Sequence, residues 1–254
     1  MSVSVIIITY NEEENIKECL ESVKWADEII VVDSFSTDKT IQLCKNYTDK
    51  IIQHQWLGYG PQRQIALELA TKDWVLNIDA DERVTKELKE EILSKINNNQ
   101  LDANGYYIPF KFYWAGKPLR FGKYGIEKHL RFFRNEKVTY SKHIVHEKAK
   151  VEGEIRSLKN HILHFSYKNI EDYFRKFNQY TTLSAIEKFN EGKKAYLYQF
   201  FFPPIDFCIR YFLKLGFLDG LPGFLYAWFS SFYRFVKYAK LWELWQKQGD
   251  KEKG

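Results

Sequence analysis

The first 96 residues alternate four times between a short apolar run and a helical pattern, and this alternation restricts the fold more than any other feature. The first two are rich in β-branched residues, as expected of buried strands, and all four runs are typical of strands. They are "VSVIIIT" from Val3, "DEIIVVD" from Asp27, "KIIQHQ" from Lys50 and "DWVLNIDA" from Asp73. A helix-forming segment follows each run. The pattern predicts a parallel, doubly wound α/β sheet.

Capping residues mark two of the expected helix starts. Asn11 is followed three residues later by Glu14, which is the spacing of a capping box. Thr85 precedes "KELKEEILSKI", a strongly patterned helical segment. We therefore expect helices to begin after Asn11 and after Thr85.

Polar side chains stand at the end of three of the four predicted strands. Residues 9–11 follow the first strand, Asp33 ends the second, and Asp79 and Asp81 end the fourth. In an open α/β sheet, ligands bind outside the carboxyl ends of the strands. These side chains should therefore line one crevice.

The stretch "NIDADER", residues 77–83, crowds three carboxylates into four positions. Two unit charges ~6 Å apart repel by roughly 3 kcal/mol at an effective dielectric of about 20. The i, i+2 spacing of Asp79 and Asp81 puts both carboxylates on one side of an extended segment. Such hard oxygen ligands suit Mg²⁺ or Mn²⁺ shared with a diphosphate, and the metal would offset the repulsion.

The pattern changes after residue 103. Short segments with glycine and charged turns over 104–165 predict a smaller mixed or antiparallel sheet. Residues 169–192 predict one amphipathic helix of about 20 residues. Two aromatic helical segments follow, interrupted by Pro203-Pro204 and by residues 216–223.

The C-terminal quarter carries the whole excess of positive charge. Residues 192–254 contain ten Lys/Arg and five Asp/Glu, and residues 196–245 contain nineteen of the forty-four aromatic residues. Such a composition fits an anionic membrane surface or a nucleic acid, and no recognised nucleic-acid module accompanies it. Three widely spaced cysteines and the lack of a secretory signal pattern lead us to expect a reducing, cytoplasmic compartment.

Four segments, "SVIIITYNEEENI", "EIIVVDSFSTDKT", "GPQRQIALELA" and "NIDADE", together resemble the motifs of family 2 glycosyltransferases. The resemblance covers residues 3 to about 96. It implies the GT-A fold, a doubly wound α/β domain with a mixed sheet, here followed by C-terminal amphipathic helices. "VHE" at 145–147 and "FLDGLPGF" at 217–224 resemble a narrower group, the bacterial enzymes that add glucose to a heptose of the lipopolysaccharide inner core.

The resemblance also implies roles for single residues. Thr9 and Asp33 would contact the nucleoside of a UDP-sugar donor, with Tyr10 and Asn11 beside them. Arg63 would approach the diphosphate. Asp79 and Asp81 would form the DxD pair that holds Mg²⁺ or Mn²⁺, with Asp81 as the direct ligand. Many members have a second acid after the second strand; Ser34 stands there, so the nucleotide stays open.

An inverting enzyme of this family needs a general base for the acceptor hydroxyl. Glu147 in "IVHEKA" is the first choice, and Asp102, Glu127 and Glu152 are alternatives. His146 is the candidate for a third metal ligand, with His164 as the other possibility. A structural zinc site in His143-x-x-His146 and His161-x-x-His164 is disfavoured, because i and i+3 point to opposite faces of a strand.

We therefore expect a donor half over residues 1–100 and an acceptor half over 101–190, followed by a membrane-associating segment over 191–254. The segment should lie on the inner face of the bacterial inner membrane without crossing it, because its charged residues outweigh its apolar ones on the insertion scale. The acceptor would be a glycolipid. Alternatives are a polyprenyl-phosphate glycosyltransferase, a non-catalytic scaffold at the membrane surface, and an aromatic segment that is simply core.

Overall fold

The computed structural model describes residues 1–122, 127–140 and 149–251, and its contacts divide the chain into two units. Unit 1 comprises residues 1–111 and 127–166, and unit 2 comprises residues 112–126 and 167–254. The expected boundary near residue 190 differs from this division, because the long helix over 170–190 and the segment 112–126 group with the C-terminal helices. Each unit is described by itself.

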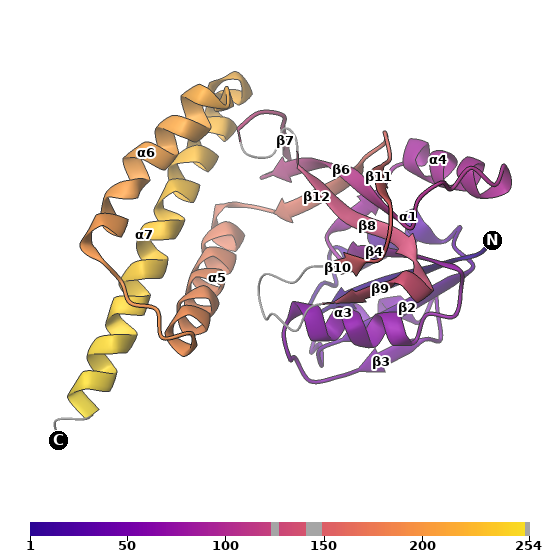
Figure 1. Ribbon diagram of the computed structural model, residues 1–254, viewed down its shortest axis with the longest axis horizontal. Helices are drawn as coiled ribbons and strands as arrows, with labels where there is room; N and C mark the ends of the chain where they lie inside the picture. Colours follow the sequence, from indigo (N-terminus) through magenta and orange to yellow (C-terminus); the bar gives the residue numbers. More distant parts are fainter. Residues whose placement is uncertain (123–126, 141–148, 252–254) are drawn as a thin grey trace. The chain divides into compact units, whose positions relative to one another are not determined.

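The four predicted strands form the parallel half of unit 1 (Figure 1). They are β1 (Val3–Thr9), β2 (Glu28–Asp33), β3 (Ile51–Gln53) and β4 (Trp74–Asp79), in the spatial order β3-β2-β1-β4. Between them run α1 (Ile16–Val23), α2 (Thr40–Cys44) and α3 (Tyr59–Glu68). The order reverses between β1 and β4, and such a switch point opens a crevice at the carboxyl ends of the strands.

The sheet continues with mostly antiparallel strands. The sequence predicted a smaller mixed or antiparallel sheet over 104–165, but most of these strands join the same ten-stranded sheet. After β5 (Glu82–Val84) and α4 (Lys86–Asn97) come β6 (Gly105–Trp114), β7 (Lys117–Leu119), β8 (Lys128–Arg134), η2 (Asn135–Lys137), β9 (Val138–Tyr140), β10 (Ala149–Val151), β11 (Ile155–Ser157) and β12 (Ile162–Tyr167). β8 pairs antiparallel with both β4 and β6, and β11 pairs parallel with β6. β9 and β10 pair with each other in a separate two-stranded sheet. The result is the mixed α/β sheet that the GT-A prediction required.

One capping prediction holds and one is wrong. The Thr85 hydroxyl accepts a hydrogen bond from Leu88 N at 3.2 Å and caps α4. The first helix begins at Ile16, and its N-cap, Asn15, makes no side-chain cap bond. Asn11 instead takes a left-handed φ of 52°, and its side-chain oxygen accepts from Thr37 N at 2.8 Å. Contacts with the turn after β2 therefore override the local capping pattern.

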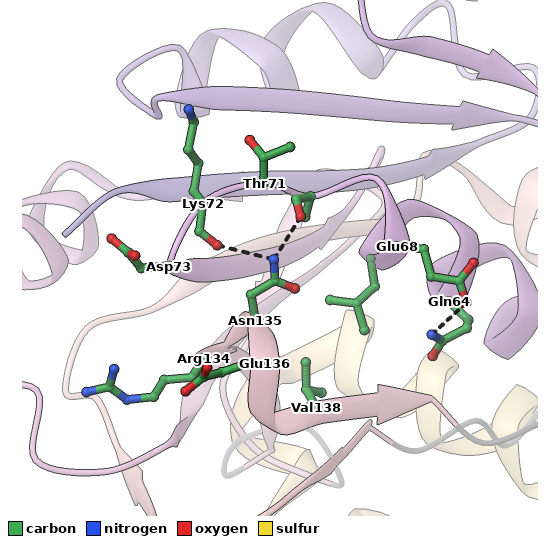
Figure 2. Close-up of a pocket in the computed structure, with 11 residues that line it drawn as sticks. Gln64, Glu68, Thr71, Lys72, Asp73, Arg134, Asn135, Glu136 and Val138 are labelled. Atoms are coloured by element: carbon green, nitrogen blue, oxygen red, sulfur yellow. Dashed lines mark hydrogen bonds between the residues drawn. The ribbon is translucent and has the colours of Figure 1, made fainter.

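A cavity of about 560 Å³ opens near the amino end of β4 (Figure 2). Thr71, Lys72 and Asp73 line it from the segment before β4, and Arg134 and Asn135 line it from the end of β8. The Asn135 amide donates to Ala70 O at 2.8 Å and to Lys72 O at 3.2 Å, so it ties these two segments together. The cavity lies at the edge opposite the carboxyl end of β4.

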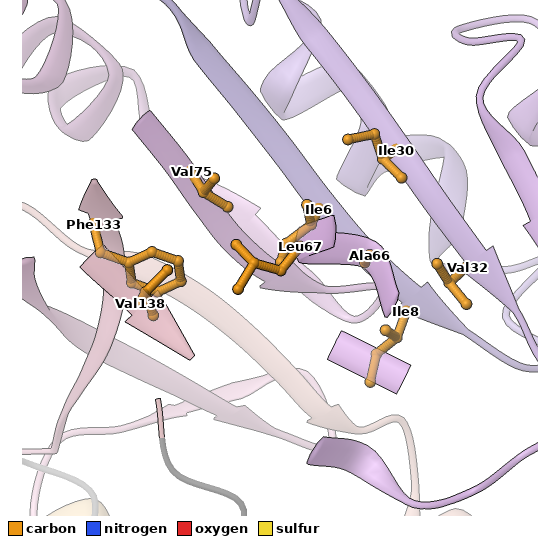
Figure 3. Close-up of a cluster of buried hydrophobic side chains, with 9 residues drawn as sticks. All are labelled: Ile6, Ile8, Ile30, Val32, Ala66, Leu67, Val75, Phe133 and Val138. Atoms are coloured by element: carbon orange, nitrogen blue, oxygen red, sulfur yellow. The ribbon is translucent and has the colours of Figure 1, made fainter. Parts of the chain in front are cut away.

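The helix α3 covers one face of the parallel strands. Buried side chains from α3, β1, β2, β4, β8 and β9 pack together there (Figure 3): Ile6, Ile8, Ile30, Val32, Ala66, Leu67, Val75, Phe133 and Val138. Such burial is worth about 1.5–3 kcal/mol for each large side chain. This cluster fixes the strand ends that carry the candidate site.

Unit 2 is helical and aromatic. It contains α5 (Ile170–Asn190), η3 (Leu197–Phe201), α6 (Phe202–Cys208), the short π-helix η4 (Ile209–Leu213), η5 (Gly216–Asp219) and α7 (Gly220–Lys251). Pro203 and Pro204 occupy the first turn of α6, where a missing N–H costs nothing, so they start a helix here. One cluster of its buried side chains comprises Trp114, Leu119, Tyr173 and Tyr226.

The basic residues of α7 are partly engaged inside unit 2. The Lys240 ammonium lies 2.7–2.8 Å from four oxygens of α5 and shares its three N–H donors among them: the backbone and side-chain oxygens of Asn178 and the hydroxyls of Thr181 and Thr182. Burial, with Lys188 and Arg234 nearby, lowers the pKa of Lys237 to about 8. The expected basic arc of α7 therefore faces neighbouring helices in part. Among the residues that the structure describes, none of the helices combines the length and apolar character that a bilayer crossing requires.

Candidate active site

The strand registers place the predicted ligand-binding residues at one edge of the sheet. Thr9 pairs with Asp33 across β1 and β2, and Ile8 pairs with Asp79 across β1 and β4. Thr9, Asp33 and Asp79 thus end neighbouring parallel strands. The expectation that these strand ends lie together is confirmed by this geometry.

The loops after β1 and β2 are joined by hydrogen bonds. Asn11 N donates to the Ser36 hydroxyl at 2.8 Å, and Ser36 N donates to Asp33 Oδ2 at 2.8 Å. The Ser36 hydroxyl also bonds Asp33 Oδ1, and the Gln53 amide donates to Asp33 Oδ2 at 3.2 Å. Asp33 is fully buried. It therefore organises the two loops.

At this edge one buried hydroxyl group lacks a hydrogen-bond partner among the described residues, and two aromatic rings are exposed to solvent. The buried Thr9 hydroxyl has no hydrogen-bond partner within the described part of the chain. Tyr10 and Phe35 are both more than half exposed, and Phe35 has a left-handed φ of 61°. The sequence interpretation missed Phe35, whose position directly after Ser34 was the only available signal. Ser34 accepts a hydrogen bond from the Gln62 amide at 2.8 Å.

Two arginines neutralise Asp79. Arg63 Nη2 lies 2.6 Å from Asp79 Oδ1, and Arg131 Nη2 lies 2.9 Å from Asp79 Oδ2. Both guanidinium groups are almost completely buried. Burial alone would raise the pKa of Asp79, but Arg131 and Arg63 hold it well below its usual range. Asp79 is therefore a firmly ionised carboxylate between two cations.

Glu82 shares Arg131 with Asp79. Arg131 Nη2 lies 2.6 Å from Glu82 Oε1, and Asp79 N donates to Glu82 Oε2 at 2.8 Å. Glu82 is completely buried, and burial raises its pKa to about 7 against the opposing effect of Arg131. Arg83 donates to Ala80 O at 3.0 Å and to Glu82 O at 2.9 Å, which fixes the backbone of the turn.

Asp81 has a different partner. His164 Nε2 lies 3.4 Å from Asp81 Oδ1, and Phe165 N donates to Asp81 O at 2.9 Å. His164 comes from β12, whose register puts it opposite Glu82. Burial would lower the pKa of His164, but the Asp81 carboxylate outweighs this and the pKa is raised. The carboxylate and the imidazole thus face each other.

The crowding of carboxylates in "NIDADER" is therefore compensated by the protein itself. Each carboxylate has a basic partner: Arg63 and Arg131 for Asp79, Arg131 for Glu82, and His164 for Asp81. The sequence interpretation assigned this compensation to a metal alone and missed Arg131. Arg131 is 52 residues from Asp79 in the sequence, in a segment that resembles an ordinary surface strand.

The predicted metal-ligand set is only partly described. His146 and Glu147 lie outside the described residues, so their roles stay predictions. Within residues 1–122, 127–140 and 149–251, no three His, Cys, Asp or Glu side chains are grouped to hold a metal ion. Asp81 and His164 supply an oxygen and a nitrogen. Mg²⁺ and Mn²⁺ prefer oxygen ligands and commonly complete their shell with water and substrate phosphates, so the Asp81 carboxylate fits such an ion.

Comparisons with known proteins agree with the motifs. The family described as "Glycosyl transferase family 2" matches residues 4–152. The lipopolysaccharide core biosynthesis glycosyltransferase LpsC of Rhizobium meliloti (strain 1021) is 33% identical over 96% of this chain and 93% of its own length. An uncharacterized glycosyltransferase of Rickettsia typhi (strain ATCC VR-144 / Wilmington) is 32% identical over 95% of this chain and 87% of its own length.

A solved structure also resembles this chain. S. aureus TarS 1-349 is 17% identical, with a TM-score of 0.48, and the alignment covers 98% of this chain and 92% of that one. The family assignment depends on the sequence matches, which span most of the chain. The chain belongs to the family 2 glycosyltransferases.

Proposed function

We propose that this glycosyltransferase transfers glucose from UDP-glucose, with inversion at the sugar, to a membrane-bound glycolipid of the lipopolysaccharide inner core. The observation that carries the proposal is the similarity to LpsC over nearly the full length of both chains. "VHE" and "FLDGLPGF" support the same group of enzymes. Residues 1–100 would bind the donor and residues 101–190 the acceptor.

The donor would bind across the carboxyl ends of β1, β2 and β4. The Thr9 hydroxyl and the loop of Tyr10 and Asn11 would contact the nucleoside beside Asp33. The Asp33 carboxylate already accepts bonds from Ser36 and Gln53, so its contribution would be to hold the loops in a binding geometry. The diphosphate would lie nearest Arg63, where Asp79 already orients the guanidinium.

The metal would be held by Asp81 together with His164. Asp79, the other member of the DxD pair, would act mainly through Arg63 and Arg131, since both of its oxygens already accept from them. When bound, Mg²⁺ or Mn²⁺ would neutralise charge on the leaving diphosphate. The Asp81 carboxylate and the neutral imidazole of His164 would orient that ion. The raised pKa of His164 predicts weaker metal binding at low pH.

The general base would be Glu147. The flanking residues support this choice, because Tyr140 and Ala149 pair with each other across β9 and β10. Tyr140 is within electrostatic reach of Arg63 and Asp79, so the described residues that flank 141–148 lie near the donor edge. Among the alternatives, Asp102 lies just before the start of β6. That start adjoins the amino end of β4, at the edge opposite the donor, and Asp102 pairs with Arg156.

The enzyme would work at the inner face of the bacterial inner membrane, where a lipid-borne acceptor and a cytoplasmic nucleotide sugar meet. Unit 2 supports this location through its many exposed apolar side chains, which monomeric soluble proteins seldom group together. The protein would be a peripheral membrane protein.

The test combines donor binding with transfer. A thermal-shift panel of UDP-, GDP-, CDP- and dTDP-sugars with Mn²⁺ should single out a UDP-sugar, because a ligand at 100 times its Kd stabilises by about 2.7 kcal/mol. Radiolabelled glucose should then enter lipopolysaccharide core, be lost with EDTA and return with Mn²⁺ or Mg²⁺. Label released from a lipid by mild acid would indicate the polyprenyl-phosphate acceptor instead. No donor hydrolysis at all would favour the scaffold.

A further inference from the structure

The turn that joins α6 to α7 exposes an unusual run of large apolar side chains. We call residues 212–221 the hairpin tip. Its six large apolar residues are all more than a third exposed, with Leu213 at 77% and Leu221 at 67%: Phe212, Leu213, Leu215, Phe217, Leu218 and Leu221. Exposed apolar patches of this kind mark interaction surfaces.

The hairpin tip is a defined turn. Leu215 takes a left-handed φ of 58°, which a leucine adopts only when its surroundings impose it. A Cβ on Gly216 would lie 2.7 Å from Arg210 O, and one on Gly223 would lie 2.1 Å from Gly216 O. The backbone therefore packs too closely here for any side chain. The motif "FLDGLPGF" encodes this close turn.

The single acidic residue of the hairpin tip is used internally. The Asp219 carboxylate accepts from Arg120 N at 3.0 Å and from Phe121 N at 2.9 Å, and Gly122 N donates to Lys214 O at 2.8 Å. These bonds satisfy backbone groups that would otherwise need water, which is the requirement for irregular backbone at an apolar boundary. They also fasten the loop after β7 to the hairpin tip.

The exposed charges around the hairpin tip are positive. Lys117 and Arg120 on the β7 loop and Lys214 on the hairpin tip itself are exposed. The sequence has no acidic residue over 112–122, and Asp219 is the only one over 207–242. An apolar point surrounded by basic side chains complements the surface of an anionic bilayer.

We propose that the hairpin tip inserts its apolar side chains into the headgroup boundary of an anionic phospholipid bilayer, with Lys117, Arg120 and Lys214 at the lipid phosphates. This inference rests on the proposed function, in which the acceptor is lipid-borne. It places the membrane contact at one turn, whereas Lys240 of the expected basic arc of α7 is bound by α5. Leu197, an exposed leucine in η3, provides the comparison.

The experiment compares Leu213→Asp with Leu197→Asp. Leu197 is 75% exposed, so the two positions match in residue type and accessibility but differ in location. Wild type should float with vesicles of equal parts phosphatidylglycerol and phosphatidylcholine, less with phosphatidylcholine alone, and less in high salt. Leu213→Asp should lower the partition coefficient by at least about tenfold, since burying one leucine is worth more than that factor. Leu197→Asp should stay within about twofold, because it removes no burial in the bilayer.

The readouts separate this proposal from the proposed function. Both variants should keep the wild-type melting temperature and the wild-type rate of UDP-sugar hydrolysis in the absence of vesicles. Absent hydrolysis with the expected flotation would refute the enzymatic proposal and leave the membrane contact standing. An equal loss of vesicle binding in the two variants, or no flotation of the wild type, would overturn the proposed membrane contact. So would a Leu213→Asp effect confined to self-association in sedimentation, which would identify a second copy of the chain as the occupant.

Discussion

Replacing Arg131 with methionine should destabilise unit 1 far more than the loss of an ordinary ion pair. Arg131 is the cation of the fully buried Glu82 and one of two cations for Asp79. Removing one partner from a buried pair costs about 3–5 kcal/mol. Asp79 would keep its charge with Arg63 as its remaining cation, and Glu82 would lose its charged hydrogen-bond donor. At about 2–4 °C per kcal/mol for a domain of this size, the melting temperature should fall by about 6–20 °C.

Circular dichroism at neutral pH would measure the effect, with two controls. Arg131→Met/Glu82→Gln also removes the carboxyl group that would be buried without its cation, so it should recover the part of the loss that comes from Glu82. Arg156→Met breaks a close but half-exposed pair with Asp102 and should leave the melting temperature within error. An Arg131→Met variant that melts like wild type, or a double variant as unstable as the single one, would refute the role assigned to Arg131.

Three further predictions concern catalysis and charge burial. Asp81→Asn should lower UDP release by several orders of magnitude without lowering the melting temperature; full activity of wild type in EDTA would contradict the metal assignment behind it. Glu147→Gln should lower transfer by about 10²–10⁴-fold with UDP binding unchanged, and a rate within about threefold of wild type would point to another base. Lys237→Met should raise the melting temperature, because the folded protein holds the pKa of Lys237 at about 8 and disfavours its charge. That gain should be largest below pH 8 and shrink as the pH rises towards the unfolded pKa of about 10.4; a gain that grows with pH in thermal melts would show the wrong sign.

The parallel half of the sheet was predictable because buried strands carry a local signal. Val3–Thr9 and Trp74–Asp79 are mostly apolar, and both segments are almost completely buried. The meeting of Thr9, Asp33 and Asp79 then followed from topology alone. The Thr85 cap was equally local.

The errors and omissions concern side chains whose contacts come from segments that are distant in the sequence. Asn11 fits a capping box, but its side chain is held by Thr37 in another loop. Arg131 gives no local signal, since its partners come from a different strand. The helical period of α7 assigns Lys240 to a basic face but says nothing of α5, which binds that lysine. The periodicity of a sequence describes one helix or strand and does not show which elements pack against it.

The aromatic cluster of unit 2 has a consequence for how the chain folds. Its buried rings come from Trp114, Tyr173 and Tyr226, and Arg120 and Asp219 are 99 residues apart in the sequence. A ribosome adds about 5–20 residues per second, so α7, which covers Trp114, is synthesised several seconds after that residue. Unit 1 ends at residue 166 and can complete its own core in that interval. A chain that stops near Lys194 would keep Trp114 and Tyr173 uncovered, and we expect it to aggregate during synthesis.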